Sequence, residues 1–146
     1  MDPTEIEEDR KKSEVADRTA DTHKKVMGMI ADLAATTEAS AIEAGARALR
    51  AVLIDHFREE EAPGGLFGEM EAMRPGFRRR ITSLRAQHRQ ALGLVEWVAE
   101  KAADKSCELA FLHNERDDLV QLLRRHESVE SRLMTDAFYI DLGCGD

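Results

Sequence analysis

The chain has few aromatic residues, few prolines and few cysteines, and these scarcities exclude several classes of protein. Aromatic residues make up 5% of its 146 residues, against 42% apolar and 34% charged residues. Three prolines and nine glycines are too few for a collagen-like or proline-rich disordered chain. Alternating runs of Val, Ile and Thr are missing, which excludes an all-β fold. No apolar run approaches the ~18 residues that a membrane span requires.

Basic residues are also fewer than acidic residues. The chain carries 21 Lys and Arg against 29 Asp and Glu, so its net charge is −8 at pH 7. This charge disfavours nucleic acids and anionic membranes as partners, and the basic run from Arg78 to Arg80 is too short to bind phosphates. The first residues lack the pattern of a signal peptide, so we expect a cytoplasmic protein. Cys107 and Cys144 are expected to be reduced thiols, with a bridge between them as the alternative.

What the sequence does contain is a helical pattern divided by turn signals. Pro63-Gly64-Gly65 and Pro75-Gly76 are the strongest of these signals, and the segment 66–73 between them fits a short extra turn. Elsewhere apolar residues recur at steps of three and four, which predicts four long helices at about 12–37, 39–62, 75–104 and 107–138. We therefore expect an all-α, antiparallel four-helix bundle at about 12–140. It would form a single domain over 1–146, with a short acidic N-terminal segment and a glycine-rich tail.

The informative feature is a set of polar residues on the apolar faces of these helices. Four of the five histidines lie there, one on each predicted helix, and two glutamates each follow a histidine at the fourth position. The six residues are His23, His56, Glu60, His88, His126 and Glu130. Side chains at positions i and i+4 of a helix lie on one face about 6 Å apart, so each His-x-x-x-Glu pair can reach one metal ion or one dinuclear centre.

A single histidine on an apolar face is usually a hydrogen-bonded core residue, and a single His-x-x-x-Glu pair arises easily in so acidic a chain. The joint set has no such explanation, because buried carboxylates without partners are strongly destabilising. A metal cation satisfies carboxylates and imidazoles together, and this mixture of ligands suits iron, manganese or zinc. The set therefore predicts a metal site.

Helical phase separates the predicted ligands from their neighbours. Glu60 lies about 40° from His56 around the helix axis, whereas Glu61 lies about 140° away and is expected to face solvent. Glu59 lies about 60° away on the other side and stays a substitute ligand. His113 lies about 220° from the nearest predicted ligand on its helix, which predicts a surface or flanking position.

The remaining marked side chains have packing interpretations. Trp97 is expected at the edge of the core. Tyr139 is expected to pack at the end of the bundle, with a contact to the site as the alternative. Phe57, Phe67 and Phe111 are expected to pack around the site and to keep it dry.

Other helical metal sites do not fit this pattern. Ferritin-like carboxylate bundles carry Glu-x-x-His, but the positions three before the last three ligand histidines hold Leu53, Arg85 and Leu123. The His-Glu-x-x-His motif of zinc proteases is absent, and so are the cysteine ligands of structural zinc sites.

The pattern that is present resembles the hemerythrin family, specifically the hemerythrin-like HHE cation-binding domains. Their signature is a histidine on the first helix, His-x-x-x-Glu on the second, a histidine on the third and His-x-x-x-Glu on the fourth. The six residues given above follow this order, and the resemblance spans about residues 14–140.

The resemblance implies a cofactor of two iron ions, with zinc and manganese as the alternatives. His23 and His56 would serve one iron, and the histidines of the third and fourth helices would serve the other. Glu60 and Glu130 would bridge the ions together with an oxo or hydroxo group. The implied function is to react with or sense oxygen, peroxide or nitric oxide, so the partner would be a small diatomic or peroxide ligand.

One departure from the oxygen-carrying members bears on this function. Those members use five histidines, with His-x-x-x-His on the third helix, whereas here Leu84 and Leu92 stand four residues to either side of His88. The carriers also have an aspartate five positions after the fourth-helix histidine, where this chain has Ser131. We therefore expect no reversible oxygen carriage, and an enzymatic consumption of peroxide or nitric oxide stays open. The alternatives are an iron sensor, a regulatory or interaction module with a structural zinc or iron ion, and a metal-free helical interaction domain.

Overall fold

The computed structural model describes residues 2–139 and consists of helices joined by short turns. The α-helices are α1 (Pro3–Ala35), α2 (Ala39–Glu61), α3 (Leu66–Met73), α4 (Arg78–Ala103) and α5 (Leu109–Met134). A 3-10 turn, η1 (Pro75–Phe77), precedes α4, and a π-helical turn, η2 (Thr135–Tyr139), continues α5. No strand occurs within residues 2–139, so the predicted all-α fold is confirmed. None of the helices described is long and apolar enough to cross a membrane.

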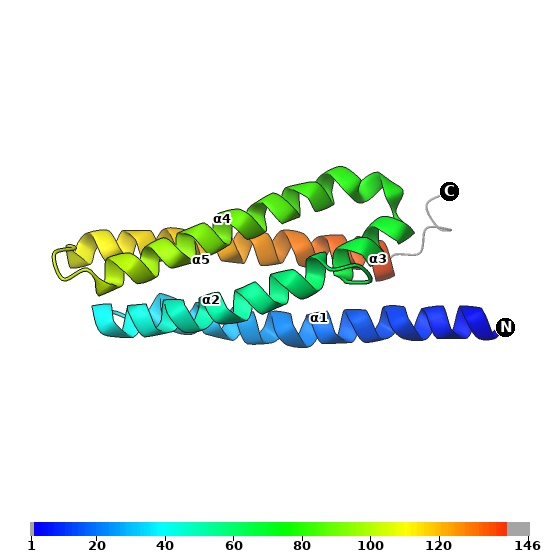
Figure 1. Cartoon of the computed structure of the whole chain (residues 1–146), viewed down its shortest axis with the longest axis horizontal. Coiled ribbons are helices and arrows are strands. Elements are labelled where there is room, and N and C mark those ends of the chain that lie inside the picture. Colours follow the sequence, from blue (N-terminus) through cyan, green and yellow to red (C-terminus); the bar gives the residue numbers. More distant parts are fainter. Residues whose placement is uncertain (1, 140–146) are drawn as a thin grey trace.

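The four long helices form a bundle, and the short α3 covers one of its ends. In Figure 1 the helices α1, α2, α4 and α5 run along the long axis of the molecule, and α3 lies near the end of the bundle from which α1 projects. Contacts join α1 to α2 and α5, and they join α4 to α2 and α5. The connection between α1 and α2 spans only residues 36–38, and that between α4 and α5 spans 104–108.

The first helix begins at Pro3, earlier than the expected start near residue 12. Its first turn is a capping box, in which the Asp2 side chain accepts a hydrogen bond from the Thr4 amide and Glu5 accepts one from the Asp2 amide. Beyond it, the Arg10 guanidinium pairs with Glu14 at 2.6 Å on the exposed surface. This part of the helix is polar, so no apolar stripe marks it in the sequence.

The turn between α2 and α3 explains why the chain needs two glycines there. Gly64 has a φ of 77°, which is the left-handed region where a side chain is strained. A Cβ atom on Gly65 would collide with the carbonyl oxygen of Glu59. This tight turn brings α3, the short element expected at 66–73, back against the end of α2.

The apolar core consists of two clusters, and the candidate ligands lie between them. On α4, Leu84 belongs to the cluster beneath α3, and Ala91 belongs to the larger cluster along the bundle. On α5, Leu133 belongs to the first of these and Leu123 to the second. His88 on α4, and His126 and Glu130 on α5, are placed between these positions. The candidate site is therefore a polar layer enclosed by apolar packing.

Candidate metal centre

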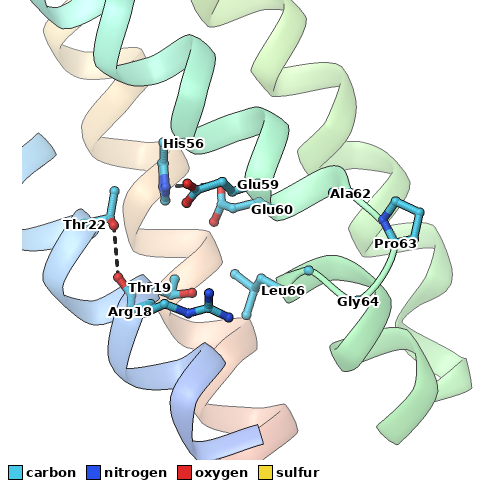
Figure 2. A pocket seen from close by; sticks show the side chains of 11 residues that line it. Arg18, Thr19, Thr22, His56, Glu59, Glu60, Ala62, Pro63, Gly64 and Leu66 are labelled. Atoms are coloured by element: carbon cyan, nitrogen blue, oxygen red, sulfur yellow. Dashed lines mark hydrogen bonds and ion pairs between the residues drawn. The ribbon is translucent and has the colours of Figure 1, made fainter. Parts of the chain in front are cut away.

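The six predicted ligands come from all four long helices and meet in the interior. His23 lies on α1, the pair His56 and Glu60 on α2, His88 on α4, and the second His-x-x-x-Glu pair on α5. The most exposed of them, His23, is 8% exposed, and Glu130 is fully buried. Figure 2 shows His56 and Glu60 on the side of α2 that faces α1. The interval of four residues places both members of each pair on a single buried face.

The candidate ligand atoms form two overlapping groups. One group is His23, His56, Glu127 and Glu130, and the other is His88, His126 and Glu130; within each, the ligand atoms lie within 4.8 Å of one another. His23 and His56 fall in one group, and His88 and His126 fall in the other. Because Glu130 belongs to both groups, two metal positions would share one carboxylate.

Glu60 and Glu130 both lie between the two histidine pairs. Glu60 Oε1 is 3.3 Å from His56 Nε2 and also 3.3 Å from His88 Nε2. Glu130 Oε1 is 2.5 Å from His23 Nε2, while its Oε2 is 3.0 Å from His126 Nε2. Each carboxylate therefore reaches one histidine of either pair, which is the placement that a bridging ligand requires.

Most of these polar atoms are buried without a hydrogen-bond partner. They are His56 Nε2, His88 Nε2, His126 Nε2, both carboxylate oxygens of Glu60 and of Glu127, and Glu130 Oε2. An unsatisfied buried polar atom costs about 1–3 kcal/mol, and a well-folded protein contains few of them. So many in one cluster, all of them metal-ligating types, fit a bound cation.

Two histidines have outer partners that leave Nε2 free to bind a metal. His126 Nδ1 lies 2.7 Å from Gln87 Oε1, which fits a ring N–H that donates to the amide oxygen. His88 Nδ1 lies 3.2 Å from Glu61 Oε2. Partners of this kind hold a ligating imidazole in one orientation and one tautomer. The expectation that Glu61 faces solvent is therefore wrong, because its side chain is one-third exposed and contacts His88 on α4.

Burial and the charges of neighbouring groups shift the pKa values of the side chains in the cluster. Burial lowers the pKa of His56 to about 4, so this imidazole is neutral, the form that binds metals. Burial raises the pKa of Glu60 well above its usual range, and the charge of Glu130 adds to the effect. Burial also opposes the charge on Glu130, but Glu60 and the surrounding imidazoles outweigh it and hold the Glu130 pKa well below its usual range. For His23, the carboxylates of Glu130 and Glu127 outweigh burial and raise the pKa.

A cavity connects the surface with the edge of the cluster. It has a volume of about 240 Å³ and lies between α1, the end of α2 and the α2–α3 turn. Figure 2 shows Arg18, Thr19 and Thr22 on its α1 side, with His56 and Glu60 opposite. Glu59, the substitute ligand, is exposed and lines this cavity. A small molecule can therefore reach two of the candidate ligands from outside.

The comparisons with known proteins agree with this geometry. The model of the hemerythrin HHE cation-binding domain matches residues 14–138, which include all six predicted ligands. The chain belongs to the hemerythrin family. No curated protein and no solved structure matches the chain closely enough to be counted as a relative. Family membership makes the chain a cation-binding domain, and the buried histidine and glutamate cluster could hold the cation.

In this hemerythrin-family chain two of the three expected phenylalanines enclose the site. Phe57 and Phe67 are buried and contact His88. The expectation for Phe111 is wrong, since it is 43% exposed and lies fifteen residues, or about 22 Å of helix, from His126. Trp97 is 40% exposed, and its indole N–H donates to Glu115 at 3.2 Å.

The remaining residues singled out from the sequence lie apart from the cluster. The His113 ring hydrogen-bonds the carbonyl oxygen of Thr37 at 2.8 Å, so it anchors the α1–α2 connection. The interpretation of Tyr139 concerns a side chain outside the described part of the chain, and Cys144 also lies outside the described residues. Cys107 is a half-buried free thiol.

The acidic residue that sequence reasoning missed is Glu127. It directly follows His126, and a rotation of about 100° should place it away from the ligand face. Instead it is 3% exposed, and its Oε2 lies 3.2 Å from His23 Nε2. The apolar pattern of α5 alone does not predict this position of Glu127, because the contact depends on how α1 packs against α5.

Proposed function

We propose that this hemerythrin-family chain binds two iron ions and reacts with or senses oxygen, peroxide or nitric oxide, without carrying oxygen reversibly. The observation that carries the proposal is the pair of overlapping ligand groups that share Glu130. A single tetrahedral ion cannot use all six predicted ligands. Two ions with shared carboxylates can, and mixed imidazole and carboxylate ligands suit iron.

The proposed scaffold is the antiparallel four-helix bundle expected from the sequence. The three-residue connection between α1 and α2 and the short one between α4 and α5 support this arrangement, because such connections join antiparallel neighbours. The contacts of α1 and of α4 with both α2 and α5 support a common interior for the two His-x-x-x-Glu pairs and the two single histidines.

Each part of the chain has a defined task in this proposal. His23 and His56 would hold one ion and His88 and His126 the other, while Glu60 and Glu130 would span both. Iron bound in this way supplies electrons to, or accepts electrons from, a small molecule. Phe57 and Phe67 exclude water from the His88 side of the site.

The cavity next to α1 supports a small external ligand. It reaches His56 and Glu60, and its volume of about 240 Å³ suits a diatomic molecule or peroxide rather than a large substrate. We place this reaction in the cytoplasm and propose no nucleic-acid or membrane partner, since the net charge of −8 disfavours both.

The test is metal analysis combined with an ultraviolet–visible spectrum of one iron-loaded sample prepared in air. We expect close to two iron ions per chain and the near-ultraviolet absorption of an oxo-bridged ferric pair. One ion per chain would contradict the dinuclear proposal. A protein that takes up zinc in preference to iron and shows no such band would favour the structural-metal alternative. A tetrahedral zinc ion needs four ligands, and one group offers four: His23, His56, Glu127 and Glu130.

A further inference from the structure

Glu127 stands outside the repeated His-x-x-x-Glu pattern but inside the cluster. Its side chain is 3% exposed and lies near α1, where Oε2 is 3.2 Å from His23 Nε2. It belongs to the ligand group of His23 and His56, and it is absent from the group of His88 and His126. Its position is therefore specific to one side of the centre.

The described protein compensates the burial of this carboxylate only in part. Both of its oxygens are enclosed and lack hydrogen-bond partners. Burial raises the pKa of Glu127 to about 7, so an ionised carboxylate in this condition is destabilising unless it takes up a proton or a cation compensates it. Its ion-pair partner, His23 Nε2, already lies 2.5 Å from Glu130 Oε1 and cannot serve two acids fully.

We propose that Glu127 is a further ligand of the ion bound by His23 and His56, so that the two metal positions are unequal. This inference rests on the proposed dinuclear centre. The His23 position then has five protein ligands: two imidazoles, Glu127 and the two shared carboxylates. The His88 position has four, namely two imidazoles and the same two carboxylates.

The inequality determines how many coordination sites each ion keeps open. The ion with fewer protein ligands, at the His88 position, keeps more of them. The cavity that admits a small molecule reaches His56 and Glu60, whereas Phe57 and Phe67 pack against His88. The third carboxylate also matters for charge, since three carboxylates together neutralise three of the four positive charges of two divalent ions.

The experiment is an anaerobic titration of metal-free protein with Fe²⁺, repeated with Co²⁺, in wild type, Glu127→Gln and Asp118→Asn. Asp118 is an exposed acid on the same helix, so its variant controls for the loss of one charge. Wild type and Asp118→Asn should bind two ions. Glu127→Gln should bind one ion unchanged and the other at least about 10-fold more weakly, comparable with the smallest losses known for residues that support metal ligands. The Co²⁺ ligand-field bands should strengthen, because one ion loses a ligand.

Thermal unfolding distinguishes this role from a structural one. Metal-free Glu127→Gln should be at least as stable as metal-free wild type, because the change removes a buried charge, and only the gain in Tm on metal binding should fall. A metal-free variant that is unstable or unfolded would overturn the assignment, and so would a variant that binds both ions as wild type does. If wild type binds one ion, the dinuclear proposal fails. Whether Glu127→Gln weakens the binding of that single ion then decides the role of Glu127. A wild type that binds no ion refutes both proposals.

Discussion

Phe57 stacks face to face on the imidazole of His88, with ring centroids 3.6 Å apart and ring planes 7° apart. Phe67 lies against the same imidazole at 5.1 Å and 23°. Glu61 contacts the Nδ1 atom of that ring at 3.2 Å. Stacking and the outer contact together fix the orientation of His88, so that Nε2 is directed to Glu60 at 3.3 Å.

Replacement of Phe57 should therefore reduce the stability of the protein. Phe57→Ala is expected to lower the free energy of unfolding of the metal-free protein by about 3–5 kcal/mol, because it leaves a cavity beside His88. Phe111→Ala is the matched control, since Phe111 is 43% exposed, and its effect should stay within about 1 kcal/mol. Chemical denaturation measures both values, and equal losses in the two variants would contradict the placement of Phe57.

The shared carboxylates should be indispensable for the metal centre. We expect Glu60→Ala and Glu130→Ala to lose bound metal, because each carboxylate contacts both histidine pairs. Glu59→Ala should retain the metal, since Glu59 is exposed on the neighbouring position of α2. Elemental analysis of folded, iron-loaded samples compares the three. Metal loss only in Glu59→Ala would show that the register of α2 is wrong at the site.

The outer partner of His126 should affect metal affinity without being a ligand. Gln87→Ala removes the amide oxygen that lies 2.7 Å from His126 Nδ1. Losses of this kind reduce metal affinity by about 10–100-fold. Gln90→Ala, an exposed glutamine on the same helix, should bind metal as wild type does. Competition with a coloured chelator gives both affinities, and identical curves for the two variants would refute the role of Gln87.

The contrast between Glu130 and Glu127 shows how far the sequence predicts the site. The helical period places Glu130 on the buried face of its own helix, so the pattern alone identifies it. Glu127 reaches the cluster because α1 packs beside α5, and Glu61 reaches His88 because α4 packs beside α2. Contacts between helices are not encoded in the period of one helix. The prediction for Phe111 is wrong for a different reason, because its place in the helical pattern does not give its distance from the site along the bundle.

The α2–α3 turn should tolerate no side chain at Gly65. A Cβ atom there would meet the carbonyl oxygens of Glu59, Glu60 and Ala62, all of them backbone atoms that cannot move independently. Gly65→Ala should destabilise the protein by several kcal/mol and disturb Glu60. Gly68→Ala is the control, because Gly68 lies within α3 with open space around it, and it should stabilise the helix by up to about 1 kcal/mol. The two substitutions should therefore change the free energy of unfolding in opposite directions.

The lack of a fifth histidine should prevent reversible oxygen carriage. An oxygen carrier must hold oxygen at one place without oxidation of the iron, and the site here is richer in carboxylate and poorer in imidazole. Anionic oxygen ligands favour ferric iron, so iron-loaded protein that is reduced anaerobically and then exposed to oxygen should become diferric. It should stay so when oxygen is removed. A visible spectrum that returns to the diferrous state on deoxygenation would contradict this expectation.

Leu84 is the position at which a histidine should change this behaviour. It is fully buried one turn before His88, and it shares an apolar cluster with Leu133, which lies one turn beyond Glu130. An imidazole at this position can reach the level of Glu130, so Leu84→His should slow the oxidation of the diferrous protein by oxygen. Leu92 is half-buried and packs against the other cluster, beyond the site, so Leu92→His should oxidise as fast as wild type. Stopped-flow spectra of the three proteins decide the matter, because equal oxidation rates in all of them would show that the missing imidazole is not what prevents carriage.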